Sequence, residues 1–526
     1  MEQLSQDLHV GLQMMNSIEL TLFSSRVSAI CDEMGMVLRR TAFSPNIKDR
    51  LDFSCALFSA DGKLFAQAAH IPVHLGSMAF AMRGIVKDRI WQEGDMLVLN
   101  DPFLGGTHLP DVTVIAPVFL EQGKSLIGFV ANRAHHANIG CDTPGSMPIS
   151  SQLDEEGLII PPTLLFSANK LQRPVLSLLG IDGDSLSGDF AAQTGANRLG
   201  VQRLQNLVEN MGLPHYQQGM VELNEYADRI TADTISQLKE GSYTFVDYLD
   251  DDGCGTSNIK LALSMTISAD AITMDFTDSS VQVAGNLNCP ESVVAAAAFY
   301  CVRCLLPDDP PACEGLFRRI VLRTTPGTIV NAVRPAAVAA GNVETSSRLV
   351  DLVFGALALA LPERVPAASQ GTMNNVAMGC INEKTGARWD YYETLAGGIG
   401  GGPTTPGRDA VHSHMTNTLN TPVESLEMHY PLRVCKYAIR RNSGGKGLHS
   451  GGAGIVREYE FLERAQLSLL SERRKLGPWG LQGGEDGQQG ENSVNGKVLP
   501  GKCSLTVKKG DRLLIKTPGG GAWGSS

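Results

Sequence analysis

The sequence has no hydrophobic run long enough to cross a lipid bilayer. The clearest apolar stretch extends from Leu352 to Leu361, about half of the roughly 20 residues that a transmembrane helix needs. The first residues, Met1 to Asp7, carry neither the basic segment nor the apolar core of a signal peptide. We therefore expect a protein of the cytoplasm that is not embedded in a membrane.

Positive charge and paired cysteines are also scarce. The net charge is -11, the isoelectric point is about 5.5, and the longest basic run is Arg473 to Lys475. This balance argues against nucleic acid as a partner. The 11 cysteines are scattered along the chain, which indicates a reducing compartment rather than a disulfide framework. The single CxxC, Cys301 and Cys304, lies in an apolar segment, and we interpret both residues as core thiols.

A nucleotide-binding loop is missing as well. The cluster Gly397 to Gly402 meets Pro403 where a dinucleotide loop needs its third glycine, and Ser443 to Gly447 lacks the spacing of a Walker A loop. We interpret these glycines as tight turns and close backbone approaches. The chain is thus predicted to hold no nucleotide site of its own.

The sequence predicts an α+β protein of several subdomains with mixed helices and strands. Its 526 residues are 43% hydrophobic and 19% charged, enough for large cores. We expect an N-terminal α+β region at 1–188 that begins with a helix over 17–42. A central helical and strand region at 189–438 and a Gly-rich, β-rich C-terminal region at 439–526 follow.

The strongest functional signal is a hairpin whose open end carries histidine and aspartate. An apolar run from Val112 to Leu120, a turn and a return strand predict this hairpin. Pairing Leu120 with Ser125 places Asp111 opposite Ala134, close to His135 and His136, with His108 beside them. Facing residues on such a ladder are about 5 Å apart at Cβ. Two imidazoles and a carboxylate with open positions form the ligand set of a catalytic divalent metal.

Structural roles are the alternative for these residues. His108 and Asp111 could form a hydrogen-bonded turn, and His135-His136 could be a solvated strand end. Because both groups meet at one hairpin mouth, we favour the metal. A register slip of one residue exchanges the two histidines, so the pattern does not choose between them.

A second predicted hairpin repeats this arrangement. Phe53 to Phe58 and Lys63 to Ala68 flank an Asp61-Gly62 turn, which places Asp52 at the hairpin mouth near His70. Asp52 could be a fourth metal ligand or could cap the strand through a hydrogen bond.

A dense polar segment lies further along the chain. His412 and His414 would share one face of a strand, and Glu424 and Glu427 would share one face of a helix. Metal binding, acid–base chemistry and a subunit contact are possible, but ordinary hydrogen bonding in a loop is the favoured interpretation.

Several long motifs resemble the hydantoinase B/oxoprolinase family, and the resemblance extends from near residue 17 to the C-terminus. They are Ser44 to Ser54, His70 to Met78, Asn100 to Asp111, Arg133 to His136, Thr143 to Met147, Thr416 to Glu427 and Pro518 to Gly521. One departure is Asn138, where the family often carries an acid.

The resemblance implies a B subunit of an ATP-dependent cyclic amide hydrolase that opens a hydantoin, 5-oxoproline or lactam ring. A separate A subunit with an actin-like ATP-binding fold would phosphorylate the amide oxygen, in a hetero-oligomer. A divalent metal, Zn or Mn, would then assist attack by water. The implied ligands fall on His108, Asp111 and either His135 or His136, with Asp52 as the fourth. The alternatives are the large subunit of a ketone carboxylase and a non-catalytic scaffold for the ATPase subunit.

Overall fold

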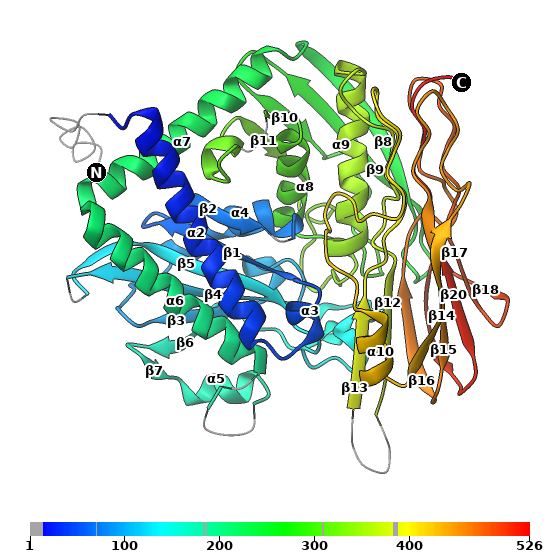
Figure 1. Ribbon diagram of the computed structural model, residues 1–526, viewed down its shortest axis with the longest axis horizontal. Helices are drawn as coiled ribbons and strands as arrows, with labels where there is room; N and C mark the ends of the chain where they lie inside the picture. Colours follow the sequence, from blue (N-terminus) through cyan, green and yellow to red (C-terminus); the bar gives the residue numbers. More distant parts are fainter. Residues whose placement is uncertain are drawn as a thin grey trace.

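The computed structural model describes residues 14–69, 71–121, 123–181, 185–186, 188–307, 310–381 and 388–526. Helices combine with four β-sheets, so the predicted mixed α+β class is confirmed (Figure 1). No helix in these ranges is both long enough and apolar enough to span a membrane.

A seven-stranded sheet forms the N-terminal part of the fold. Its strand order is β2-β1-β5-β4-β3-β6-β7. The strands are β1 (Phe53–Ser59), β2 (Leu64–Ala69), β3 (Met96–Leu99), β4 (Asp111–Leu120), β5 (Ser125–His135), β6 (Thr163–Ser167) and β7 (Lys170–Leu171). Both predicted hairpins, β1–β2 and β4–β5, are present. They also pair with each other, because β1 is hydrogen-bonded to β5.

Helices cover both faces of this sheet. Helix α2 (Ser17–Thr41) begins at a capping box formed by Asn16 and Glu19, and it runs beside α6 (Gly188–Met211) across one face (Figure 1). Helix α4 (Val73–Lys87) lies on the other face. The β5 neighbours Asn132 and Arg133 show this division: Asn132 donates to the Gln193 carbonyl of α6, and Arg133 donates to Ser77 Oγ of α4. Successive strand residues point to opposite faces.

The central part stacks helices onto a second sheet. Helix α4 packs against α8 (Glu291–Arg303), α8 against α9 (Ser346–Ala360), and α9 against β8 (Gly241–Asp251) and β9 (Ser257–Ile267). The sheet is completed by β10 (Ile272–Asp275) and β11 (Ile320–Arg323). A π-helix, η6 (Gly341–Thr345), leads directly into α9.

The predicted helical pair broken by Gly212 is confirmed as α6 and α7 (Leu213–Ser236).

The prediction of two core thiols is right for Cys301, which is buried, and wrong for Cys304, which is exposed. Cys304 is the C-cap of α8, so it lies at the end of the helix, whereas Cys301 lies in its buried body.

The C-terminal part contains two further sheets, drawn from yellow to red in Figure 1. One has the order β13-β12-β16-β19, with β12 (Asn375–Ile381), β13 (Arg388–Glu393), β16 (Ala465–Leu470) and β19 (Lys502–Val507). The other has the order β14-β15-β20-β17-β18, with β14 (Leu432–Arg440), β15 (Gly454–Phe461), β20 (Arg512–Lys516), β17 (Glu491–Val494) and β18 (Lys497–Leu499). The first of these sheets joins strands from both sides of the expected boundary at 438/439.

The glycine clusters of this part bring backbones close together. A Cβ on Gly520 would overlap the carbonyl oxygen of Ile399, so only glycine fits there. The remaining short elements are α3 (Pro45–Lys48), α5 (Arg173–Leu178), α10 (Val423–His429), η2 (Pro102–Leu104), η3 (Pro144–Ser146), η4 (Leu153–Glu156) and η5 (Glu314–Phe317).

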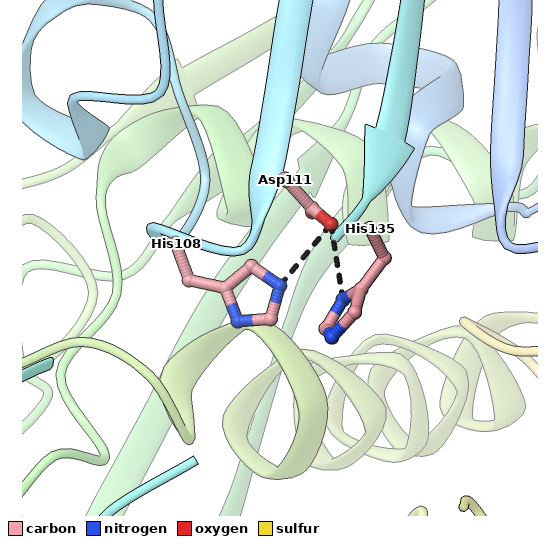
Figure 2. A group of neighbouring side chains, drawn as sticks. All are labelled: His108, Asp111 and His135. Atoms are coloured by element: carbon pink, nitrogen blue, oxygen red, sulfur yellow. Dashed lines mark ion pairs between the residues drawn. The ribbon is translucent and has the colours of Figure 1, made fainter. Parts of the chain in front are cut away.

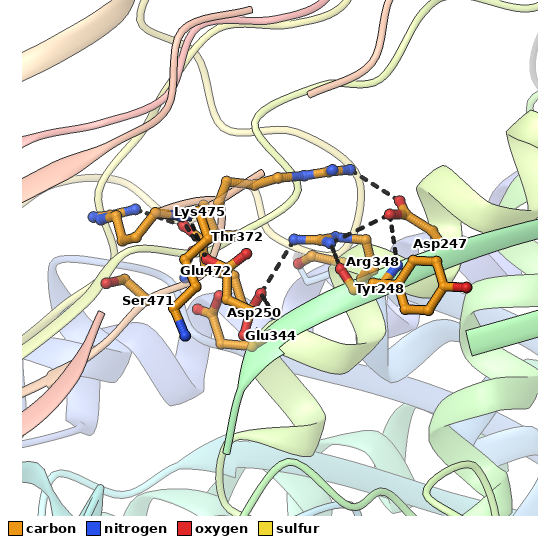
Figure 3. A network of polar contacts seen from close by, with 12 residues as sticks. Asp247, Tyr248, Asp250, Glu344, Arg348, Thr372, Ser471, Glu472 and Lys475 are labelled. Carbon is orange, nitrogen blue, oxygen red and sulfur yellow. Dashed lines mark hydrogen bonds and ion pairs between the residues drawn. The ribbon is translucent and has the colours of Figure 1, made fainter. Parts of the chain in front are cut away.

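A buried network of charged side chains joins the central and C-terminal parts (Figure 3). The Arg348 guanidinium lies 3.5 Å from Asp247 and 3.3 Å from Glu472, and all three residues are buried. Glu344, on η6, accepts hydrogen bonds from the Met373 amide and from Asn375. Burial and the nearby Glu472 carboxylate raise the pKa of Glu344 to about 7. Glu344 is therefore partly protonated at neutral pH.

Candidate metal centre

Strand pairing brings Asp111 and His135 face to face. Asp111 is the first residue of β4, His135 is the last of β5, and the two are register partners. The predicted register, which put Asp111 opposite Ala134, is off by one residue. Leu120 does pair with Ser125, but an irregularity between Val118 and Phe119 adds a residue to β5 and shifts every later pair.

The two adjacent histidines point to opposite faces of the sheet. His135 shares the face of Asp111 and Arg133, beneath α4. His136 faces α6, where its Nε2 is 2.9 Å from Gln193 Oε1 and its ring centroid is 4.5 Å from that of Phe190. His136 therefore lies on the far side of the sheet from Asp111.

His108, Asp111 and His135 form one compact buried group (Figure 2). Asp111 Oδ1 lies 3.2 Å from His108 Nε2 and 3.3 Å from His135 Nδ1. One potential ligand atom from each residue falls within 4.8 Å of the others. Burial alone would raise the pKa of Asp111, but the surrounding histidines hold this pKa well below its usual value. Asp111 is consequently a carboxylate at neutral pH.

The residues present fit a divalent metal. His108 Nε2, Asp111 Oδ1 and His135 Nε2 are buried and form no hydrogen bond with the described residues, although His108 Nε2 and Asp111 Oδ1 face each other at 3.2 Å. Buried polar atoms without partners are costly, and a cluster of them calls for an explanation such as a bound ion. Imidazole and carboxylate donors suit Zn or Mn.

Hydrogen bonds to the second oxygen of Asp111 fix its orientation. Asp111 Oδ2 accepts from Thr107 Oγ1 at 2.7 Å and from Asn342 Nδ2 at 3.3 Å, and it lies 3.3 Å from His74 Nε2. The His108 ring is held in turn by an Nδ1 contact of 3.2 Å with the Ala339 carbonyl. Such outer contacts orient ligands and tune their basicity.

Sequence reasoning missed His74 and Asn342. His74 stands within one of the family-like motifs, so a signal was present, but its place beneath Asp111 depends on how α4 crosses the sheet. Asn342 is 231 residues from Asp111, and no local pattern connects the two.

Asp52 lies beside this group without joining it. Its carbonyl accepts from the His135 amide at 3.0 Å, because β1 pairs with β5. Its carboxylate is 3.9 Å from Arg50 and is not among the ligand atoms within 4.8 Å. A fourth-ligand role for Asp52 stays a prediction. His70, expected next to Asp52, lies outside the described residues.

The other polar segment is placed elsewhere. His412 and His414 lie outside the strands, so the predicted shared strand face is wrong. His414 Nε2 is 3.4 Å from Asp351. Glu424 and Glu427 are on helix α10, as predicted, and Glu427 accepts from the Val434 amide at 2.8 Å.

Comparisons with known proteins agree with this architecture. Residues 16–526 match the sequence profile described as hydantoinase B/oxoprolinase. The chain is 41% identical to 5-oxoprolinase 1 of Arabidopsis thaliana, over 97% of this chain but only 42% of that longer protein. It is also 41% identical to a protein of Methanocaldococcus jannaschii, of which it covers 91%. A Pseudomonas protein (strain NS671) named as the B subunit of a D-/L-hydantoinase is 32% identical, with 91% of its length covered.

Solved structures show the same fold. The ATP-dependent caprolactamase of Pseudomonas jessenii superposes with a TM-score of 0.89 at 26% identity, covering 98% of this chain and 92% of that one. Nucleotide-free acetone carboxylase superposes with a TM-score of 0.83 at 18% identity, covering 96% and 75% respectively. On the match across nearly its whole length, the chain belongs to the hydantoinase B/oxoprolinase family.

Proposed function

We propose that this chain is the metal-dependent B subunit of an ATP-dependent hydrolase that opens cyclic amides. The observation that carries the proposal is the buried group of His108, Asp111 and His135 with its unpartnered ligand atoms. The sequence relatives named for 5-oxoprolinase and hydantoinase, and the caprolactamase fold, support the substrate class.

A separate A subunit with an actin-like ATP-binding fold would complete the enzyme. The chain has no recognisable nucleotide-binding loop, and it corresponds to 42% of the longer 5-oxoprolinase 1. An unactivated lactam carbonyl is a poor electrophile. Phosphorylation of its oxygen by the A subunit would make the carbon attackable and supply a good leaving group.

The residues of this chain would then position water and the activated ring. A metal held by His108, Asp111 and His135 would lower the pKa of water towards about 7 and supply hydroxide. Thr107, His74 and Asn342 keep one oxygen of Asp111 engaged and leave the other directed towards both imidazoles. The burial of the group excludes bulk water, which strengthens each of these electrostatic contacts.

Co-purification with the cognate A subunit tests this proposal. The pair should hydrolyse ATP when a hydantoin, 5-oxoproline or a simple lactam is added, and each isolated subunit should not. Ring opening by this chain alone without ATP would contradict the division of labour. Absence of stoichiometric metal after chelator-free purification would favour a scaffold role.

A ketone carboxylase is the alternative enzyme, since acetone carboxylase shares the fold. The 26% identity with caprolactamase, against 18% with acetone carboxylase, favours the hydrolase. Consumption of bicarbonate with ketone, in place of ring opening, would favour the carboxylase.

A further inference from the structure

A buried arginine whose hydrogen bonds within the described residues all go to neutral acceptors lies next to the candidate metal centre. Arg50 is 0% exposed. Its guanidinium donates to the Tyr392 carbonyl at 3.0 Å, to Thr394 Oγ1 at 3.1 Å and to Asn46 Oδ1 at 3.3 Å. All three acceptors are neutral. The only ion pair assigned to Arg50 within the described ranges is with Asp52 at 3.9 Å, which is too long for a hydrogen bond.

Arg50, its hydrogen-bond partner Asn46, and His412, on which the Arg50 charge acts, also carry polar atoms that have no partner in the part of the chain that the structure describes. They are Arg50 Nε, Asn46 Nδ2 and both ring nitrogens of His412. Asn46 is 3% exposed. Burial and the Arg50 charge lower the pKa of His412 to about 4, so the neutral imidazole has one N–H to donate.

The chain segment that carries His412 is held against this group. The Leu419 amide donates to the Arg50 carbonyl at 3.1 Å, and the Val73 amide donates to the Met415 carbonyl at 3.3 Å. The segment therefore passes both Arg50 and the start of α4, the helix that carries His74. This path brings the segment of residues 412–419 against the N-terminal part of the chain, although it lies more than 300 positions from Arg50 in the sequence.

One aromatic ring connects Arg50 with the candidate metal centre. The Arg50 guanidinium lies 4.9 Å from the centroid of the Tyr392 ring. The His135 ring stacks on Tyr392, with centroids 5.1 Å apart and planes inclined by 6°. The Tyr392 ring thus contacts both the Arg50 guanidinium and the His135 ring.

We propose that Arg50, Asn46 and His412 bind the phosphoryl group of the activated substrate while its ring carbon lies at the metal group. The proposal rests on the proposed function, in which a phosphorylated cyclic amide brings an anion to this site. The Asp52 carboxylate, at 3.9 Å, pairs with this buried guanidinium without a hydrogen bond, so a phosphoryl anion within hydrogen-bond distance would stabilise the buried charge further. Arginine suits phosphoryl oxygens because its planar fork can donate two parallel hydrogen bonds. The binding is non-covalent, and no bond is made or broken by these three residues.

Binding of inorganic phosphate to the purified full chain tests the site. Titration would be followed by calorimetry, once with metal loaded and once after chelation, because phosphate can also bind a metal directly. The variants are Arg50→Lys, which keeps the charge but loses the fork, and His412→Gln. His429→Gln is the matched control, since His429 is exposed on α10. Circular dichroism and metal content would establish that each variant is folded.

We expect phosphate to bind the chelated wild-type chain, and its Kd to rise about tenfold or more in each folded site variant, as the loss of a charge-assisted hydrogen bond implies. His429→Gln should bind as the wild type does. If Arg50→Lys does not fold, His412→Gln decides alone. Unchanged binding in the folded variants, or binding only when metal is present, would overturn the proposal. A third outcome separates the two proposals: phosphate binding that depends on Arg50 and His412, in a chain that opens no ring when mixed with its A subunit. This outcome would support the anion site and refute the proposed function.

Discussion

The neighbouring histidines His135 and His136, at the end of β5, offer the sharpest test of the metal assignment. Replacing each by alanine removes the same side chain at two consecutive positions that point to opposite faces of the sheet. His135→Ala removes a proposed metal ligand and a ring stacked on Tyr392. His136→Ala removes a hydrogen bond to Gln193 and a contact with Phe190.

The expected magnitudes follow from these contacts. His135→Ala should lose stoichiometric metal, and its melting temperature should no longer respond to a chelator. In the wild type, metal at about 100 times its Kd should stabilise the fold by about 2.7 kcal/mol. His136→Ala should keep its metal. It leaves Gln193 Oε1 without this buried partner and opens a small cavity, which should cost about 2–4 kcal/mol of folding free energy.

Metal content by mass spectrometry and thermal unfolding with and without chelator measure both effects. Each variant serves as the control for the other. Loss of metal in His136→Ala with full retention in His135→Ala would refute the assignment of His135.

Three further predictions concern the surroundings of the site. Thr107→Val keeps the shape of the side chain but removes the 2.7 Å hydrogen bond to Asp111, so metal affinity measured by competition with a chelator should fall about 10- to 100-fold; unchanged affinity would deny Thr107 a positioning role. The pKa of Glu344 is raised to about 7 in the folded protein, from about 4.5 in the unfolded chain. Between these two pH values the unfolded chain has lost this proton while the folded protein still holds it. The free energy of unfolding therefore falls as the pH rises, by an amount on the order of 3 kcal/mol. Glu344→Gln retains an acceptor for the Met373 amide and should flatten this part of the stability–pH profile in denaturant titrations; a profile that keeps the wild-type slope would contradict the origin given for it. Asp111→Asn should abolish metal binding while the circular dichroism spectrum stays native, and full metal occupancy in this variant would exclude Asp111 as a ligand.

Local patterns predicted much of the fold and part of the site. Alternation of apolar residues and the Asp61-Gly62 turn identified the two hairpins, and the break at Gly212 identified the helical pair. The pairing of β1 with β5 was not predicted, because it joins residues 69 to 81 positions apart through a register that no turn sets. This pairing brings Asp52 beside His135.

The choice between His135 and His136 depended on a single irregularity in β5. A hairpin pattern fixes which residues are near its open end, but one extra residue reverses the face of every later side chain. Asn342 reaches Asp111 from 231 residues away through the packing of η6, and Met415 accepts a hydrogen bond from the start of α4. Contacts of this kind follow from tertiary packing and leave no local periodicity to detect.

Anomalous X-ray diffraction from crystals of the metal-loaded chain tests the central claim most directly. Data collected at the absorption edge of the bound metal should give one strong peak at about 2.0–2.2 Å from nitrogen atoms of His108 and His135 and from Asp111 Oδ1. A peak on the α6 side at His136, a peak at His412 or His414, or no peak in protein that carries stoichiometric metal would contradict the account.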